Sequence, residues 1–247
     1  MVLSDVDIRK ELIDGENIMI FPLKLENVKG SSINLTASKY AWRISDNNSA
    51  IVDDKIRIPA NETVCIYTEE SVWVSRRIAG TYYSKVSQVS EGMGHISTTL
   101  DPQFLGLSLI AVNNPSNNPI DIVIGTTFVT LMFHYLKTPA TRGKNENSAS
   151  RQDLSSSFKL SDGEKEYLRK DVFRSYEGLK AAMLSSLNYE ILTEERDREI
   201  QAEKQKVKEK KEFKKTFWYP LIIGLVGAIV GGAISVTGNI IVEVYLK

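Results

Sequence analysis

An uncharged apolar run near the C-terminus constrains this chain more than any other feature of its sequence. No Asp, Glu, Lys or Arg occurs from residue 216 to residue 242. A helix over this run, rising 1.5 Å per residue, is long enough to cross a hydrocarbon layer about 30 Å thick. Phe217, Trp218 and Tyr219 stand at its start, where amphipathic rings favour the headgroup region of a bilayer. The sequence therefore predicts a single transmembrane helix over residues 216–242, with a buried core helix as the alternative.

The charges beside this run predict its orientation. Residues 203–215 contain seven lysines and three glutamates, although the whole chain balances 31 basic against 31 acidic residues. Because lysine excess marks the cytoplasmic side of a span, we expect residues 1–215 in the cytoplasm and a short tail, residues 243–247, outside. Gly227 and Gly231 lie four residues apart within the span, a spacing that lets helices approach closely. Self-association of the helix stays open.

Residues 1–137 have the pattern of a mainly β domain. Short runs that alternate apolar and polar residues recur between turn signals, and many such strands at this spacing are typical of a sandwich or barrel. The clearest runs are residues 18–20, 32–36, 72–74, 107–112 and 128–133. One helix opens the domain, with Ser4 as its cap and Ile8, Leu12 and Ile13 on one face.

The segment between the β domain and the apolar run is expected to be helical after a flexible start. Residues 138–160 are polar and poor in large apolar side chains, which predicts a linker or a lid. Ser161 and Glu164 form a capping-box pattern, and a helix is predicted over residues 161–187. Residues 161–215 together are expected to form a helical, charged stalk, and within it residues 193–215 are expected to be either a solvated helix or a weak coiled coil.

Several stretches occur in the order found in one enzyme family. The segments are Leu3–Ile8, Gly30–Leu35, Ile58–Glu62, Thr68–Val72, Gly94–Gly106 and Asn114–Phe133. In this order they resemble the dCTP deaminase/dUTPase family over about residues 1–137. The resemblance implies a dUTPase-like β fold, a homotrimer with nucleotide sites between subunits, and pyrimidine deoxynucleoside triphosphates as ligands. It implies no nucleic-acid partner.

The resemblance puts deaminase chemistry in doubt. Deamination needs a group that activates a water and moves its proton. In the family's deaminases a glutamate lies ten residues after the signature aspartate, which aligns with Asp101, and this position is Ala111 here. The family's motif arginine aligns with Gln88, while its serine aligns with Ser84 and the next position is Lys85. A methyl group cannot move a proton, so the resemblance favours a degenerate deaminase site.

A dUTPase-like hydrolysis does not need the proton-transfer glutamate that deamination needs. By resemblance, Asp101 would orient a water, Phe104 would pack on the deoxyribose, and Ser84 and Lys85 would contact phosphate, with Mg²⁺ on the phosphates. The alternative for Asp101 is a turn carboxylate ahead of Pro102. Both interpretations stay open.

Basic residues follow the β domain. Arg142 and Lys144 lie where the family often has a flexible lid, so they are candidates to close over a triphosphate. A solvated linker is the alternative.

The remaining candidate residues have structural interpretations. His95, His134 and Cys65 do not form a set at zinc-ligand spacing, which excludes a zinc-dependent deaminase. We expect both histidines and the cysteine to be structural.

Three functions follow from these observations. The first is a membrane-anchored nucleotide sensor or effector that has lost deaminase chemistry. The second is an active enzyme, either a dCTP deaminase or a dUTPase-like hydrolase using Asp101. The third is a non-catalytic trimeric assembly module. The sequence does not identify the nucleotide, and it leaves open whether the membrane helices form a pore.

Overall fold

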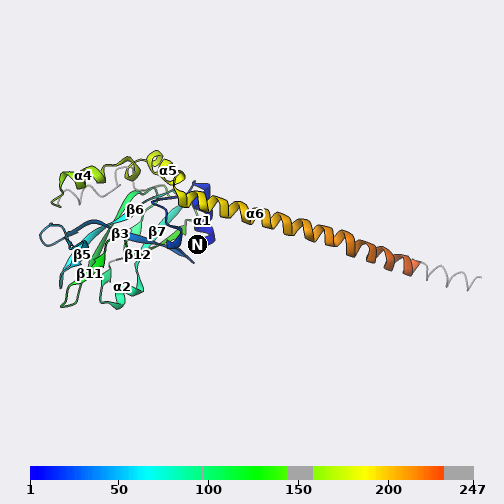
Figure 1. The fold of residues 1–247 in the computed structure, drawn as a ribbon, viewed down its shortest axis with the longest axis horizontal. Coiled ribbons are helices and arrows are strands. Elements are labelled where there is room, and N and C mark those ends of the chain that lie inside the picture. Colours follow the sequence, from blue (N-terminus) through cyan, green and yellow to red (C-terminus); the bar gives the residue numbers. More distant parts are fainter. Residues whose placement is uncertain (96, 144–157, 231–247) are drawn as a thin grey trace, which may run out of the picture. The chain divides into compact units, whose positions relative to one another are not determined.

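The computed structural model of the protein describes residues 1–95, 97–143 and 158–230 (Figure 1). The chain divides into two compact units, Met1–Thr193 and Glu194–Lys247. The candidate sites lie in the first unit, and the candidate membrane segment lies in the second.

The first unit is built on antiparallel strands, which confirms the mainly β fold. Its larger sheet has the order β8-β10-β6-β3-β12-β7-β9, with β1 added beside β6 and β2 beside β3. A small sheet has the order β11-β5-β4. The strands are β1 (Ile18–Phe21), β2 (Val28–Lys29), β3 (Ser32–Arg43), β4 (Ile51–Val52), β5 (Lys55–Ile58), β6 (Thr63–Val74), β7 (Ile78–Ser84), β8 (Gly94–His95), β9 (Thr99–Leu100), β10 (Leu105–Asn113), β11 (Ile120–Val123) and β12 (Thr127–Tyr135).

Strand β3 joins the two halves of the larger sheet. Its first part pairs with β12, as in Leu35 with Val129, and its second part pairs with β6, as in Trp42 with Cys65. Most side chains of β3 and β6 are buried, whereas those of β12 largely alternate between buried and partly buried, and Leu35, Ile66 and Leu131 are fully excluded from solvent. The alternation in β12 therefore follows from one face of the strand packing into a shared core.

Helix α1 (Asp5–Asp14) closes one side of this core. Ser4 and Asp7 form a capping box, in which the Asp7 amide donates to Ser4 Oγ and the Ser4 amide donates to Asp7 Oδ2. Gly15 ends the helix with φ of 65°, a left-handed conformation that glycine adopts without strain. Ile8 and Leu12 are fully buried, as their helical spacing predicted.

The helical segment after residue 157 differs from the expected single helix over residues 161–187. It consists of α4 (Asp162–Leu168), a 3₁₀ turn, η3 (Asp171–Phe173), and α5 (Tyr176–Leu184), followed by α6 (Leu187–Phe213). The capping box of Ser161 and Glu164 does start α4. Ser175 then caps α5 by accepting from the amide of Gly178 at 2.9 Å, so the chain restarts a helix instead of continuing one.

These helices pack on the sheet instead of starting a stalk at residue 161. Leu179 and Met183 of α5 are fully buried in the main core, and the amide of Ile20 in β1 contacts Met183 Sδ at 3.4 Å. Figure 1 shows α4 and α5 along the same side of the β domain. The compact unit reaches Thr193, so the charged helical part begins later than the sequence suggested.

A second aromatic cluster holds the segment that we name the strap, residues 158–175. The Phe158 ring stacks on Trp42 with centroids 5.1 Å apart, and the Tyr167 ring stacks on Tyr40 at 4.3 Å. Leu168 and Phe173 are buried in the same cluster. Residues 158–160 of the expected linker therefore belong to the strap, because aromatic side chains fix the strap to β3, while residues 144–157 lie outside the described residues.

The second unit is helical throughout its described part. The helix Leu187–Val230 is the one described helix whose length and composition would allow it to cross a membrane. A five-residue π-helical stretch, Lys214–Trp218, interrupts its α-helical geometry, and apolar side chains from Phe213 onward are exposed. Residues 231–247, which include part of the expected span, Gly231 and the expected tail, lie outside the described residues.

Candidate functional site

The predicted carboxylate Asp101 begins a tight turn after β9. The amide of Phe104 donates to the Asp101 carbonyl at 3.1 Å, and Gln103 adopts φ of 64° between them. Thr99 Oγ1 donates to Asp101 Oδ1 at 3.3 Å. Pairing of Gly80 with Leu100 fixes this turn against β7. Asp101 is therefore a turn residue, and its side chain also faces a cavity.

That cavity has a volume of about 110 Å³. It is lined by Tyr82, Thr98, Thr99, Asp101, Phe104, Ser108, Leu109 and Ile110. The Tyr82 and Ser108 hydroxyls lie 2.6 Å apart within hydrogen-bonding distance. Burial, with a smaller contribution from the Asp101 charge, raises the pKa of Tyr82 far above its ordinary value. Tyr82 thus stays a neutral phenol beside the carboxylate.

Phe104 lines the same cavity as Asp101. Its side chain is 8% exposed and belongs to the main core. The structure therefore brings two of the predicted residues together, although most of the Phe104 ring packs inside the protein.

Ser84, Lys85 and Gln88 form a second group, at the junction of β7 and the short helix α2 (Val86–Ser90). Lys85 Nζ donates to the Thr127 carbonyl and hydroxyl on β12. Gln88 Oε1 is buried without a hydrogen-bond partner among the described residues. None of the three lines the Asp101 cavity, so within one chain the predicted phosphate contacts and the predicted carboxylate are separate.

The segment that carries Arg142 runs past the Asp101 turn. The Ala140 amide donates to the Arg76 carbonyl at 2.8 Å. A Cβ at Gly143 would lie 2.5 Å from the Pro102 carbonyl oxygen, which shows how closely the two backbones approach. Arg142 is exposed one residue earlier. Lys144, the other predicted lid residue, lies outside the described residues.

The strand that carries Ala111 holds no acidic residue. Ala111 is half-buried on β10, opposite Cys65 of β6. The buried carboxylate of Glu70, on β6, accepts from the Thr36 amide at 2.8 Å and the Thr36 hydroxyl at 2.6 Å. Burial raises the pKa of Glu70, while those hydrogen bonds and Lys24 lower it. Both Glu70 carboxylate oxygens are therefore hydrogen-bonded to Thr36, so Glu70 does not replace a general base on β10.

The structure gives local roles to His134 and Cys65. His134 Nε2 lies 3.2 Å from Thr81 Oγ1, and the buried Cys65 has a pKa raised by burial. Across the described ranges, no three His, Cys, Asp or Glu side chains are grouped to hold a metal ion.

Sequence reasoning missed Tyr82 and Ser108. The one available signal was a hydroxyl within the apolar run of β10, because a buried hydroxyl usually has a partner. Nothing in the alternation of β7 distinguished Tyr82 from a core residue.

Comparisons with known proteins place the β domain near one group of enzymes. No family model matches the chain. The dCTP deaminase of Pyrococcus horikoshii is 27% identical over 139 residues, which are 56% of this chain and 85% of that protein. The dCTP deaminase of Thermococcus gammatolerans is 28% identical over 145 residues, covering 58% of this chain and 87% of that protein.

Solved structures with related folds have lower identity. The dCTP deaminase of Agrobacterium tumefaciens has a TM-score of 0.46 and 14% identity, covering 55% of this chain and 48% of that one. EIAV dUTPase has a TM-score of 0.39 and 17% identity, covering 53% of this chain and 98% of that one. The sequence relatives support a dCTP deaminase/dUTPase-like relationship for the β domain.

Proposed function

We propose that this protein is a membrane-anchored sensor or effector that binds pyrimidine deoxynucleoside triphosphates and has lost deaminase chemistry. The observation that carries the proposal is Ala111. The β domain is similar in sequence to dCTP deaminases over most of their length, yet the strand that carries Ala111 has no carboxylate. Nucleotide binding does not need this carboxylate, whereas deamination needs a group that moves a proton to or from the cytosine.

The nucleotide site is proposed to form between copies of the chain, as the resemblance implies for a homotrimer. Its elements are incomplete in one copy, because Asp101 and Phe104 line one cavity while Ser84, Lys85 and Gln88 lie elsewhere. Mg²⁺ would then accompany the phosphates of the nucleotide, and Arg142 and Lys144 would cover them.

The anchor is proposed to be the apolar helix. Its described part is continuous with the lysine-rich stretch that favours the cytoplasmic side. This orientation puts the β domain in the cytoplasm, with access to soluble nucleotides, and the C-terminus outside. A sensor that reports to a membrane partner has a use for such a helix.

A second candidate is an active enzyme, and the geometry at Asp101 favours hydrolysis over deamination. The Asp101 carboxylate lines a cavity with the neutral hydroxyls of Tyr82 and Ser108. A carboxylate of this kind can orient a water toward a phosphate without a base on β10. A dUTPase-like hydrolase is therefore the alternative, ahead of a dCTP deaminase with a displaced base.

One experiment separates these functions. The full chain in detergent is titrated with dCTP, dUTP and CTP in the presence of Mg²⁺, and binding, product and oligomeric state are recorded together. Asp101→Asn tests the cavity, and Asp53→Asn, at an exposed position with φ of 50°, is the matched control.

Each outcome decides between the candidates. Binding without product, lost in Asp101→Asn and kept in Asp53→Asn, supports a sensor. Product that vanishes in Asp101→Asn identifies an enzyme. Intact trimers that bind no nucleotide would overturn both and indicate an assembly module.

A further inference from the structure

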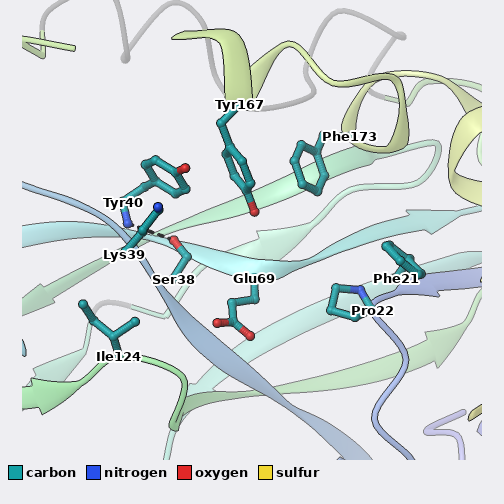
Figure 2. A pocket seen from close by; sticks show the side chains of 9 residues that line it. All are labelled: Phe21, Pro22, Ser38, Lys39, Tyr40, Glu69, Ile124, Tyr167 and Phe173. Atoms are coloured by element: carbon teal, nitrogen blue, oxygen red, sulfur yellow. Dashed lines mark hydrogen bonds between the residues drawn. The ribbon is translucent and has the colours of Figure 1, made fainter. Parts of the chain in front are cut away.

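A larger cavity lies under the strap, away from Asp101. Its volume is about 290 Å³, close to the lower end of the range for small-molecule sites. It is lined by Phe21, Pro22, Ser38, Lys39, Tyr40, Glu69, Ile124, Tyr167 and Phe173 (Figure 2). Two of these residues belong to the strap and the others to the β domain, so the cavity exists only because the strap covers the sheet.

Tyr167 is held in place from both sides. Its ring stacks on Tyr40 at 4.3 Å, with 25° between the planes, and contacts Phe173 at 4.8 Å. Figure 2 shows the Tyr167 hydroxyl directed toward the side of the cavity that holds Glu69. Burial, followed by the charges of neighbouring groups, raises the pKa of Tyr167 to about 12. Tyr167 therefore offers a fixed, neutral hydroxyl, which has no hydrogen-bond partner among the described residues.

Glu69 supplies a hydrogen-bond acceptor to the same cavity. Its Oε2 pairs with Lys24 Nζ at 2.9 Å, and its Oε1 has no partner in the described part of the chain. The side chain is 29% exposed, so this oxygen can accept from a ligand that enters the cavity. Lys39 is exposed at the rim, with its ammonium 5.6 Å from the Tyr40 ring centroid.

The remaining walls are apolar except for Ser38, whose hydroxyl oxygen accepts from the Tyr40 amide at 3.1 Å. Phe21, Pro22 and Ile124 face the cavity with the rings of Tyr40 and Phe173. A mainly apolar pocket with a few polar groups, here the Tyr167 and Ser38 hydroxyls, the Glu69 carboxylate and the Lys39 ammonium at the rim, is the usual composition of a site for a small organic ligand.

From this geometry we infer that the cavity binds an amino-substituted heteroaromatic ring, such as the base of a nucleoside or nucleotide. The amino group would donate to Glu69, and an adjacent ring nitrogen would accept from the Tyr167 hydroxyl. Lys39 lies where a phosphate on the same ligand would leave the cavity. Cytosine, adenine and guanine carry an amino group beside a ring acceptor. In uracil the donor is the ring N3–H, which is flanked by a carbonyl on each side, so when it donates to Glu69 and one carbonyl accepts from Tyr167, the other carbonyl lies beside the carboxylate and weakens binding.

This site shares no lining residue with the Asp101 cavity. Its strap residues also lie beyond the part of the chain that resembles dCTP deaminases. The inference therefore stands without the proposed function. A ligand that touches both Glu69 and Tyr167 binds only when the strap is closed, and so it stabilises the closed strap by mass action.

The test titrates the full chain in nanodiscs with cytidine, adenosine, guanosine and uridine by calorimetry. We expect at least one amino-bearing nucleoside to bind once per chain, and uridine to bind at least tenfold more weakly. Glu69→Gln removes the charge at nearly constant shape and should weaken that nucleoside at least tenfold. Tyr167→Phe keeps the ring stack, removes the hydroxyl and should also weaken it. Glu91→Gln, exposed at the end of α2, is the matched control with unchanged affinity.

Three results would overturn the inference. The first is that none of the four nucleosides binds at millimolar concentration. The second is that uridine equals the others and Glu69→Gln changes nothing. The third is that nucleoside binding disappears in Asp101→Asn and persists in Glu69→Gln, which would assign it to the other cavity. The proposed function is tested by deoxynucleoside triphosphate binding in Asp101→Asn. Failure of nucleosides to bind under the strap would therefore be distinct from failure of the proposed function.

Discussion

The hydroxyls of Tyr82 and Ser108 lie 2.6 Å apart and join β7 to β10 beside Asp101. Both side chains are buried, and the Ser108 amide donates to Thr68 Oγ1 at 3.0 Å. A buried hydroxyl without a partner costs more than an ordinary hydrogen bond contributes. This pair therefore holds the back wall of the Asp101 cavity in one arrangement.

The first prediction concerns this pair. Tyr82→Phe leaves the Ser108 hydroxyl buried and unpaired, so we expect the free energy of unfolding to fall by about 1–3 kcal/mol. Ser108→Ala should cost a similar amount, and the double variant should cost less than the sum, because both changes remove the same contact. Thermal unfolding of the full chain in detergent measures these differences.

The control for this pair is the next residue along β7. Tyr83 is 44% exposed, so Tyr83→Phe should leave the stability within about 0.5 kcal/mol. Additive effects of the two single variants would show that the hydroxyls do not act as a pair.

The second prediction concerns pH. Burial raises the pKa of Glu70 above its ordinary value of 4.5, so the folded chain binds this proton more tightly than the unfolded chain. By linkage, the contribution of Glu70 to stability is largest at acid pH and is lost as the pH rises through the folded pKa. Glu70→Gln should therefore be more stable than the parent at pH 7, and the difference should shrink as the pH falls toward 4.

The measurement is the stability difference between Glu70→Gln and the parent across this pH range. The Gln side chain can still accept from the Thr36 amide and can donate to the Thr36 hydroxyl, so both positions keep a hydrogen bond. Glu91→Gln serves as the exposed control and should show no such trend. A difference that stays constant with pH would mean that Glu70 keeps an ordinary pKa.

The third prediction concerns α5. Leu179 is fully buried in the main core, so Leu179→Ala should lower the free energy of unfolding by about 2–5 kcal/mol. Leu184, on the same helix, is 43% exposed, and Leu184→Ala should change little. A chain that ends at residue 193 should fold, whereas one that ends at residue 157 loses the cover of β1 and should unfold at lower temperature. Equal melting temperatures of these two truncated chains would contradict the packing of α5.

The strands and the first helix follow from local patterns. Residues 107–112 and 128–133 alternate because one face enters the core, and Ser4 caps α1 through the pattern that the sequence displays. The break between α4 and α5 was not predictable from spacing, because the apolar residues on either side of it fit one continuous stripe. Packing of Met183 on Ile20 connects residues 163 positions apart, and no local rule reports such a contact.

Part of the candidate site could be predicted from the sequence and part of it could not. Asp101 and Phe104 lie in one turn, so their order along the chain already placed them together. Tyr82 and Ser108 reach the same cavity from β7 and β10, two strands that do not pair with each other in the sheet. The cavity under the strap needed Tyr40, Glu69 and Tyr167 to come from three distant segments, and periodicity assigns each of them to an ordinary strand or helix face.

The last prediction tests whether the apolar helix spans a membrane, as proposed. Val226 lies in its apolar part, and a lysine near the centre of a span costs about 2.5–3.5 kcal/mol on the insertion scale. Val226→Lys should therefore move part of the protein from the membrane fraction to the soluble or aggregated fraction. Fractionation of cells after alkaline extraction measures this shift.

Val207 gives the matched control because it lies among lysines and glutamates of the same helix and is 48% exposed. Val207→Lys adds the same charge where the helix is already charged, so its membrane fraction should equal that of the parent. If Val226→Lys also behaves as the parent, the apolar helix does not lie in the hydrocarbon layer, and contacts with another protein must hold the chain wherever it is found. If both variants leave the membrane fraction, the added charge itself is responsible and the position along the helix carries no information. Only a loss confined to Val226→Lys supports an anchor that passes through the bilayer at this residue.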